Sequence, residues 1–431
     1  MKHRWLVAAL ALSILPVPSA EAASDGTGFT TISCRMPAGA PIPGSGNVLH
    51  VTTTGTAGNP SNGNAQQVLD SAREGDLVIF HDGVYRGGLS VKVPGIRIRG
   101  ESRNGTILDG GSTREIGIAV ISQDRVVIEN MTAHNFRRHG FFWHHVHGWW
   151  ARYLTVYNNA LYGIYAFDSR CGQLDHSYGS GNADSAFYIG ECFPCDATIT
   201  DSIAESNALG YSGTNAGGNL ILKNSVWRDN GLGIVPNSLV GEDRPPQRGA
   251  IIKNNLVENN NGKNTPGTGL AGSFWGVGIA IAGGVGNVVY GNVVTDHALA
   301  GIVLAPLPDG NLWIPSGNTV WGNTVTHDAA QYPDSFDLGQ NLLSGAGNCW
   351  ADNTFGNSAP PAIEQIFDCG LPTTPPGGSP QIELGLVQGY PLSLNGRVHS
   401  DWRTWPVPAG GLSQPDAPAG QLPGWLPDVS Y

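Results

Sequence analysis

Charged residues are scarce in this chain, and basic residues are scarcer than acidic ones. Asp, Glu, Lys and Arg make up 13% of the 431 residues, with 23 Lys and Arg against 34 Asp and Glu, which gives a formal net charge of −11. No basic stripe is available to neutralise phosphates, which argues against nucleic acid or an anionic membrane as a partner. Beyond the N-terminal segment no apolar run is long enough to span a bilayer, so we expect no membrane insertion.

The N-terminus has the pattern of a secretory signal. A basic start at Lys2–Arg4 precedes an apolar run at Leu6–Val17, which is too short to cross a membrane, and Ala20–Ala22 is a small-residue cleavage site. We therefore expect residues 1–22 to be removed and the mature protein to be secreted to the extracellular space. Residues 23–46 are polar and rich in Gly and Pro, which predicts an extended lead-in.

The six cysteines indicate disulfides, because an exported chain folds in an oxidising compartment. We expect one bridge between Cys349 and Cys369 at the C-terminal end of the repeats, and a local bridge within Cys192–Cys195. A zinc site at Cys192–Cys195 is the alternative, although it lacks a second ligand pair at metal spacing. Cys34 and Cys171 are left without an assigned partner.

Glycine is abundant, with 61 residues, and it opens a repeated apolar phrase. The phrase recurs at steps of 23, 23, 24 and 23 residues, and after a longer stretch it returns twice more, again 23 residues apart. A fixed period in this range is typical of stacked units, each of which covers the apolar face of its neighbour. The copies are Gly140–Trp143, Gly163–Ala166, Ala186–Ile189, Gly210–Tyr211, Gly233–Val235, Gly278–Ile281 and Gly301–Leu304.

A second landmark is an alternating apolar segment that ends in Asn or Asp, as in Val126–Asn130 and Leu220–Asn224. Each repeat therefore contains at least two strands separated by turns. After residue 224 the steps lengthen, which places extra loops at 236–248, 262–273 and 305–316. Insertions in a solenoid collect on one face, and that face is often the one that binds.

Several polar residues have a structural interpretation. Asp175 and Asp201 stand at the landmark position that Asn holds elsewhere, so we interpret them as turn residues. Four asparagines include two pairs spaced 23 residues apart, which predicts a ladder of side-chain amides bonded from one repeat to the next. They are Asn135, Asn158, Asn207 and Asn230.

Over residues 47–370 this arrangement resembles the right-handed parallel β-helix family, which has the pectate-lyase-like fold. Ala65–Ala72, followed by Gly75–Ile79 and Gly83–Tyr85, is similar to the capping helix and first rung of that family. The resemblance implies an all-β chain, a single-stranded right-handed parallel β-helix with a short N-terminal capping helix. The fold hosts lyases, hydrolases, epimerases, adhesins and phage spikes, so it does not select an activity.

Residues 371–431 form a Pro/Gly-rich C-terminal tail. Its composition is that of a linker, but it contains Trp402, Trp405 and Trp425. Because tryptophans are rarely left fully exposed, we expect the tail to lie on the solenoid.

Stacking turns positions in successive repeats into neighbours about 4.8 Å apart. Five residues after three phrase starts stand His145, Asp168 and Glu191, with His147 and Arg170 beside them. Two neighbouring carboxylates disfavour joint ionisation, so one pKa rises unless a cation such as Arg170 offsets the repulsion. A protonated acid beside an ionised one suits acid/base chemistry on a sugar. Ca²⁺ bound through these oxygens and a simply solvated turn column are the alternatives.

The segment Arg137–Trp150 contains four His, three Trp and two Arg. Alternation along a strand sends some of these side chains outward, where rings can stack on sugars and imidazoles can bind metal or move protons. We take Arg138, His139, Trp143 and His147 as candidate substrate-binding residues. The alternative is that the aromatics fill the interior and the histidines cap turns.

The sequence therefore predicts a secreted β-helix protein that engages a polysaccharide or cell-surface glycan near residues 139–245. As an enzyme it would be a lyase, hydrolase or epimerase in which Asp168 and Glu191 form the acid/base pair. His145 is an alternative base, and Arg170 would neutralise uronate or enolate charge. No cofactor other than Ca²⁺ is indicated.

Residues 162–170 are faintly similar to the catalytic rung of alginate epimerases of this fold, but Tyr165 stands where that family has its first Asp. The acidic motifs of polygalacturonase-type glycosidases and the pectate-lyase pattern are not found. The rival hypothesis is a non-catalytic extracellular binding or structural solenoid, in which the tryptophans bind the glycan.

Overall fold

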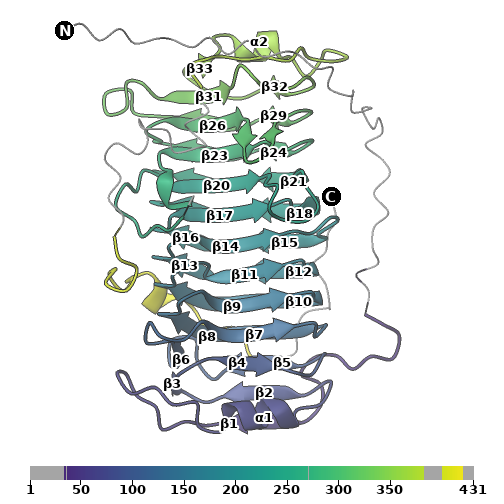
Figure 1. Ribbon diagram of the computed structural model, residues 1–431, viewed down its shortest axis with the longest axis vertical. Helices are drawn as coiled ribbons and strands as arrows, with labels where there is room; N and C mark the ends of the chain where they lie inside the picture. The colour runs from purple at the N-terminus through teal and green to yellow at the C-terminus, as the bar shows by residue number, and fades with distance from the viewer. Residues whose placement is uncertain (1–33, 35, 270, 383–399, 421–431) are drawn as a thin grey trace, which may run out of the picture. The chain divides into compact units, whose positions relative to one another are not determined.

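The computed structural model describes residues 34, 36–269, 271–382 and 400–420. The predicted signal segment, most of the lead-in before residue 36, and Trp425 lie outside the described residues. The described chain is a parallel β-helix whose strands stack in successive rungs (Figure 1). No helix among these residues is long and apolar enough to cross a membrane.

One face of the solenoid is an eleven-stranded parallel sheet. In spatial order its strands are β4 (Leu89–Val91), β7 (Ile116–Ile121), β9 (His139–His144), β11 (Ile164–Phe167), β14 (Ser185–Gly190), β17 (Leu209–Thr214), β20 (Leu232–Asn237), β23 (Val277–Ala282), β26 (Ala300–Ala305), β31 (Phe336–Gln340) and β33 (Ser358–Ala359).

The remaining strands of the rungs form a twenty-stranded sheet. In chain order they are β1 (Val48–Val51), β2 (Leu77–Phe80), β3 (Gly83–Tyr85), β5 (Arg97–Gly100), β6 (Thr106–Asp109), β8 (Val126–His134), β10 (His147–Tyr157), β12 (Arg170–Asp175), β13 (Tyr178–Ser180), β15 (Ala197–Thr200), β16 (Ile203–Glu205), β18 (Gly217–Lys223), β19 (Val226–Arg228), β21 (Arg248–Lys253), β22 (Leu256–Glu258), β24 (Val288–Tyr290), β25 (Val293–Thr295), β29 (Thr319–Trp321), β30 (Thr324–Thr326) and β32 (Cys349–Ala351).

The sequence period equals one turn of the solenoid. Ile164 of β11 pairs with Phe187 of β14, Phe187 pairs with Tyr211 of β17, and Tyr211 pairs with Ile234 of β20, all in parallel register. These partners are the apolar residues that recur in the repeated phrase. The predicted stack of like units is confirmed.

The core is made by the residues of each phrase that point inward. Phe141, Trp143, Phe187 and Ile234 have no solvent exposure and belong to one apolar cluster that runs the length of the helix. Each rung alone would leave this face in water, so burial against the next rung supplies most of the driving force for stacking.

Helices close both ends of the stack. The predicted N-terminal helix is α1 (Ala65–Ser71), which buries Ala65 and Leu69 completely against the first rungs. At the other end α2 (Ile363–Ile366) buries Ile363. Covering the terminal rungs protects strand edges that would otherwise pair with other chains.

Internal amide ladders connect the rungs, and their membership corrects one prediction. Asn207 and Asn230 are ladder residues as expected, but Asn135 and Asn158 occupy left-handed turns with φ of 58° and 53°. The ladder residue is the one that follows the left-handed turn, a distinction that spacing alone does not make. The observed ladder is Asn159, Asn182, Asn207, Asn230 and Asn260, joined by amide-to-amide hydrogen bonds of 2.8–2.9 Å.

The two predicted bridges, Cys349–Cys369 and Cys192–Cys195, are present. The second bridge removes the thiolates that a zinc site there would need. Cys34 and Cys171 form the third disulfide, which ties the lead-in to β12.

The C-terminal segment 400–420 lies on the larger sheet, at the outer side of the early rungs (Figure 1). Backbone carbonyls of this segment accept hydrogen bonds from Arg97, Arg99 and Arg103, and the Trp405 carbonyl accepts one of 2.7 Å from Asn158. The guanidinium groups therefore hold the segment through its backbone. The short elements outside the two sheets are η1 (Ala271–Ser273), the hairpin strands β27 (Leu307–Pro308) and β28 (Leu312–Trp313), and η2 (Gly411–Ser413).

Candidate functional site

The predicted polar column is a stack of left-handed turns at the end of the eleven-stranded sheet. His145, Asp168, Glu191 and Asn215 each follow a strand of that sheet, with φ of 55°, 43°, 53° and 49°. The amide of Asp168 donates to the carbonyl of Gly190, at 3.0 Å, and the other turns are joined in the same way. Residues that are 23 or 24 positions apart in sequence thus become vertical neighbours.

The structure brings two of the predicted residues into direct contact and adds a third group. His145 Nε2 lies 3.0 Å from Asp168 Oδ2. The other carboxylate oxygen of Asp168 forms an ion pair with Arg244, and the same guanidinium donates to the Glu191 carbonyl at 2.6 Å. Arg244 therefore joins the turns of Asp168 and Glu191.

Glu191 is 5% exposed and is more buried than His145 and Asp168. Burial first, and then the negative charges of Glu242, Asp243 and Asp168, together raise the pKa of Glu191 to about 7. A hydrogen bond of 2.9 Å from the Asp243 amide to Glu191 Oε1 acts in the opposite direction. Near neutral pH this carboxyl group therefore has a proton to donate.

The described residues show no ion pair between Arg170 and the acids of the column, where Arg244 pairs with Asp168 instead. Arg170 starts β12 in the larger sheet, where it pairs with His147, and its charge acts on Asp196. His147 Nε2 lies 3.4 Å from Cys171 Sγ. Arg170 and His147 are the first residues of strands β12 and β10 in the larger sheet, whereas Asp168 and Glu191 lie in the turns that follow the eleven-stranded sheet.

Two of the proposed substrate-binding residues are inside the protein. Trp143 has no solvent exposure and packs against Trp149 in the core, so its ring is not available to a sugar on the outer surface. His139 is 1% exposed and packs among the rings of Phe142, Tyr162 and Tyr165. Burial lowers the pKa of His139 to about 3, so it is a neutral packing group at physiological pH.

The surface next to the column is aromatic. Phe142 and Tyr165 occupy one register position on β9 and β11, their rings stack at 5.2 Å, and both are partly exposed. Arg138 is exposed near this strip, and its charge acts on Tyr165. The exposed ring faces and the cation, rather than the tryptophans, are the groups that can meet a glycan here.

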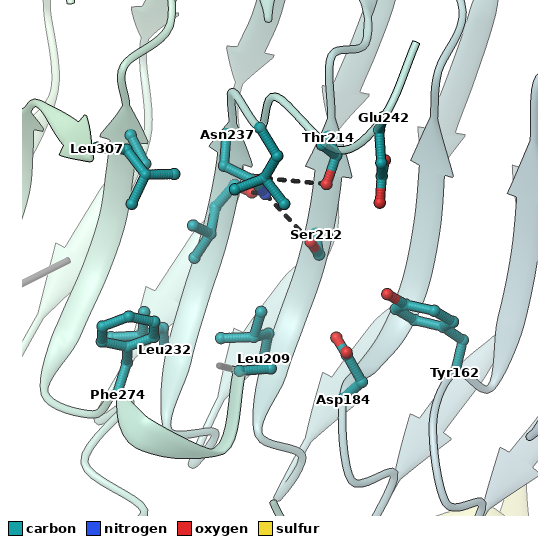
Figure 2. A pocket seen from close by; sticks show the side chains of 14 residues that line it. Tyr162, Asp184, Leu209, Ser212, Thr214, Leu232, Asn237, Glu242, Phe274 and Leu307 are labelled. Atoms are coloured by element: carbon teal, nitrogen blue, oxygen red, sulfur yellow. Dashed lines mark hydrogen bonds between the residues drawn. The ribbon is translucent and has the colours of Figure 1, made fainter. Parts of the chain in front are cut away.

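A pocket opens on the same outer face, over strands β17, β20 and β23 (Figure 2). It encloses about 590 Å³ of empty space, including the part open to solvent. Tyr162, Asp184 and Glu242 lie on one side, and Leu232, Phe274 and Leu307 lie on the opposite side (Figure 2). Other lining residues include Leu209, Ser212, Thr214, Val235, Asn237, Leu239, Ala271 and Ala282.

Two acids connect this pocket to the column. Glu242 accepts a hydrogen bond of 2.9 Å from the Tyr188 hydroxyl and also hydrogen-bonds Glu191, and burial raises the pKa of Glu242. Burial also raises the pKa of Asp184 to about 7, although a hydrogen bond from Tyr162 lowers it in part. The pocket and the column thus share a set of interacting carboxyl groups.

Sequence reasoning missed Arg244 and Glu242. Both lie in the insertion 236–248, which the lengthened repeat had marked as an extra loop on a binding face. The run Glu242-Asp243-Arg244 was the available signal. The sequence could not show that this loop folds back across the turns of Asp168 and Glu191, because an insertion has no equivalent in the neighbouring repeats.

The donor set does not suit Ca²⁺. The Asp168 carboxylate faces the Arg244 guanidinium and His145, and Glu191 Oε1 already accepts a backbone hydrogen bond. A guanidinium at this position repels a second cation. Over the part of the chain that the structure describes, Cys34, Cys171 and Asp196 are grouped closely enough for a metal, but the two cysteines are bonded to each other.

Comparison with known proteins identifies the fold. Residues 140–306 match the family model described as the right handed beta helix region. The A-module of the mannuronan C-5 epimerase AlgE4 from Azotobacter vinelandii superposes with a TM-score of 0.50 at 15% identity, covering 74% of this chain and 93% of that module. DFA-IIIase from Arthrobacter chlorophenolicus A6, without its lid, gives 0.49 at 13% identity, with 73% and 90% covered.

A third solved structure, the alginate lyase from Paenibacillus sp. str. FPU-7, gives a TM-score of 0.40 at 14% identity, covering 72% of this chain and 99% of the lyase. Comparison with the curated proteins finds no match. The chain is a right-handed parallel β-helix.

Proposed function

We propose that this β-helix protein is an enzyme that modifies a polysaccharide by acid/base chemistry at the column of His145, Asp168 and Glu191. The observation that carries the proposal is the arrangement of these three groups on successive turns, with Arg244 bound to the Asp168 carboxylate and to the backbone carbonyl of Glu191. A buried acid with a raised pKa directly above a salt-bridged carboxylate is typical of an acid/base pair.

Glu191 is the proton donor in this proposal. Asp168, oriented by His145 and Arg244, is the group that accepts a proton or attacks the sugar. The backbones of the two residues stand one strand spacing apart, about 4.8 Å. In retaining enzymes two carboxyl groups about 5 to 5.5 Å apart act on one glycosidic bond, and the proposal requires the two side chains to adopt such a separation.

Arg244 supplies the positive charge that the sequence assigned to Arg170. Held by the Asp168 carboxylate and the Glu191 backbone, it neutralises negative charge on the reacting group, whether a uronate carboxylate or the oxyanion that develops after proton abstraction. Phe142 and Tyr165 offer ring faces over which neighbouring sugars can stack.

The A-module of the mannuronan C-5 epimerase AlgE4 supports a polysaccharide substrate, because that module shares this fold over 93% of its own length. A place outside the cell is supported by the three disulfides, which persist in oxidising compartments, and by the signal-like N-terminus. The reaction is a cleavage or an epimerisation of the sugar chain.

The test is a screen of purified protein on plant, algal and bacterial polysaccharides. It should record new reducing ends, the ultraviolet absorbance of unsaturated uronates and, by NMR, changes in sugar configuration. We expect activity on at least one substrate, and its loss in Asp168→Asn and Glu191→Gln. The matched control is Asp201→Asn, because Asp201 also occupies a left-handed turn (φ 51°), at a solvent-exposed position that follows β15 in the larger sheet.

Activity that survives both substitutions would remove the site assignment. Glycan binding without turnover on any substrate would favour the non-catalytic solenoid, for which the partly exposed strip at Phe142 and Tyr165 is the specific support.

A further inference from the structure

We propose that the pocket beside the column is a terminal subsite that holds the uncharged sugar at the end of a glycan chain. This inference rests on the proposed function, and it adds that the enzyme attacks chain ends rather than internal bonds. It is carried by the shape of the outer face, by the chemistry of the lining and by the contact between pocket and column.

The outer face of the eleven-stranded sheet is open at one end and closed at the other. On β9 and β11 the outward residues Phe142 and Tyr165 are partly exposed. At the same register position on β23 and β26 stand Ala280 and Val303, exposed by 1% and 0%. A separate apolar cluster covers these later rungs, and it includes Ala271 and Phe274 around η1 and Leu307 of β27.

The pocket lies where the covered part begins. Ser212, Val235 and Ala282 form its floor on β17, β20 and β23, with exposed fractions of 6%, 6% and 0%. Phe274 and Leu307 stand at its far side (Figure 2). Tyr162, Asp184 and Glu242 line the side toward the earlier rungs (Figure 2), and Tyr188 beside them on β14 is only 1% exposed, so the pocket is walled on both sides along the stack. A continuous chain therefore cannot pass through, which leaves a chain end as the occupant.

The lining matches a sugar ring. Carboxyl, amide and hydroxyl groups of Asp184, Glu242, Asn237 and Ser212 can bind sugar hydroxyls, and Phe274 offers a ring to the C–H face of the sugar. Asn237 is oriented by hydrogen bonds, because it donates to Ser212 Oγ at 3.2 Å and accepts from Thr214 Oγ1 at 2.9 Å. Such a rigid polar wall opposite an apolar one selects the orientation of the ligand.

The charge of the lining selects an uncharged end. Asp184 and Glu242 are the charged residue types among the lining residues, and no Lys, Arg or His is among them. The groups packed against these acids are the hydroxyls of Tyr162 and Tyr188, Thr214 and the carboxyl group of Glu191. A uronate in the pocket would meet a pair of carboxyl groups and no compensating cation among the lining residues, whereas a neutral hexose gains hydrogen bonds.

Pocket and column are in contact, which sets the bond that is attacked. Glu242 lines the pocket and hydrogen-bonds Glu191, and the Asp243 amide bonds the same carboxyl group. A terminal sugar in the pocket therefore places its linkage to the next sugar beside Glu191. The next sugar lies near Arg244, the cation of the site, and it can carry a carboxylate.

The experiment separates binding from catalysis. The probe is an array of oligosaccharides that end in neutral hexoses or in uronic acids, with matched members whose ends are blocked, and the protein is Asp168→Asn so that turnover plays no part. We expect binding to neutral free ends, reduced at least about tenfold by Ser212→Tyr, which fills the floor of the pocket. The matched control is Ala119→Tyr, which adds the same ring at the equivalent position on β7, at the open end.

Thermal unfolding checks that each variant is folded, and Phe274→Ala, which removes only the far ring, replaces Ser212→Tyr if that protein does not fold. Binding to uronate ends or blocked ends as strong as to neutral ends would overturn the inference, as would binding that neither pocket substitution weakens, or no binding to the array. If neutral ends bind through the pocket but no polysaccharide is turned over, the proposed function fails while the subsite stands.

With an active substrate in hand, early products give the second measurement. An enzyme that works from ends releases small products before the viscosity of the polymer falls, and a rapid early fall in viscosity would contradict attack at the end.

Discussion

The early and late rungs of the eleven-stranded sheet share one backbone geometry but have opposite surfaces. On β9, β11 and β14 the outward column is Phe142, Tyr165 and Tyr188, and the following turns hold His145, Asp168 and Glu191. On the later strands β20, β23 and β26 the same column is Val235, Ala280 and Val303, buried under loops.

The difference shows that the repeated phrase determines the backbone scaffold, whereas the outward residues of each strand determine whether that surface is covered by loops or can meet a ligand. Small apolar residues on the later rungs allow the loop around η1 and the β27–β28 hairpin to pack on the sheet. On β9 and β11 the aromatic residues are partly exposed and leave that part of the face open to solvent and to ligands, whereas Tyr188 on β14 is 1% exposed beside the pocket. The boundary between the two regions is the pocket.

The turn column shows the same division. After Glu191 the series continues with Asn215 and Ser238, and their side chains bond the local backbone: Asn215 donates to the carbonyls of Leu239 and Glu242, and Ser238 to that of Gly283. These later turns hold loops in place, whereas the early turns carry charge. The predictions below test this division of chemistry and stability.

The largest expected effect is on activity in the early rungs. Asp168→Asn makes this turn resemble that of Asn215, and the left-handed backbone tolerates Asn. We expect kcat/KM to fall about 10³-fold, equivalent to about 4 kcal/mol of barrier, with little change in unfolding free energy. Steady-state kinetics and chemical denaturation measure both, and a loss of stability that matches the loss of activity would contradict the division.

In the later rungs a ladder substitution should affect stability instead. Asn318 is fully buried, accepts from Asn287 and donates to the Gly284 carbonyl and to Asn348. Asn318→Ala leaves these groups unpaired, so we expect a loss of about 3 kcal/mol in unfolding free energy.

Denaturant titration provides this value, and activity per folded molecule should stay constant. Asn311→Ala, at an exposed position of the β27–β28 hairpin, is the control and should change stability by less than about 0.5 kcal/mol.

A smaller effect concerns the pH dependence of the rate. If Glu191 donates the proton, its protonated form is active, so kcat/KM should fall as pH rises through about 7 and lose roughly tenfold for each further unit. A rate profile from pH 5 to 9 measures this limb. The residual rate of Glu191→Gln should lack the limb, and an unchanged limb in that variant would assign the titration to another group.

The smallest expected effect is on stability as a function of pH. The pKa of Asp184 rises from 3.8 to about 7 on folding, so between these values the folded state binds more protons than the unfolded state. The unfolding free energy therefore falls as pH rises from about 4 to 7, and it is highest on the acid side of this window.

We expect Asp184→Asn to reduce the difference in unfolding free energy between pH 4.5 and 7 by about 1 kcal/mol. The expected reduction is small because Asp184 is partly exposed to solvent. Unfolding measured at pH 4.5 and 7 gives the difference, and Asp201→Asn should leave the slope unchanged.

Local periodicity determined most of the fold. Parallel stacking places a residue directly over the one about 23 positions later, so the repeated phrase alone assigned Phe141, Ile164 and Phe187 to one row. The structure shows that this row points inward. The same rule placed His145 beside Asp168, and the resemblance of Ala65–Ala72 to the family's capping helix predicted α1. It did not decide the outward or inward direction of Trp143, since that depends on where the strand begins.

The tertiary structure decided what has no period. The return of the 236–248 insertion across the turns brings Arg244 to Asp168 and Glu242 to the pocket, and the lead-in brings Cys34 to Cys171. One residue of offset also moved the ladder from Asn158 to Asn159. The repeats could be predicted from the sequence because each rung has the same apolar pattern as its neighbour. The positions of loops and chain ends depend on packing against surfaces formed by residues far away in the sequence.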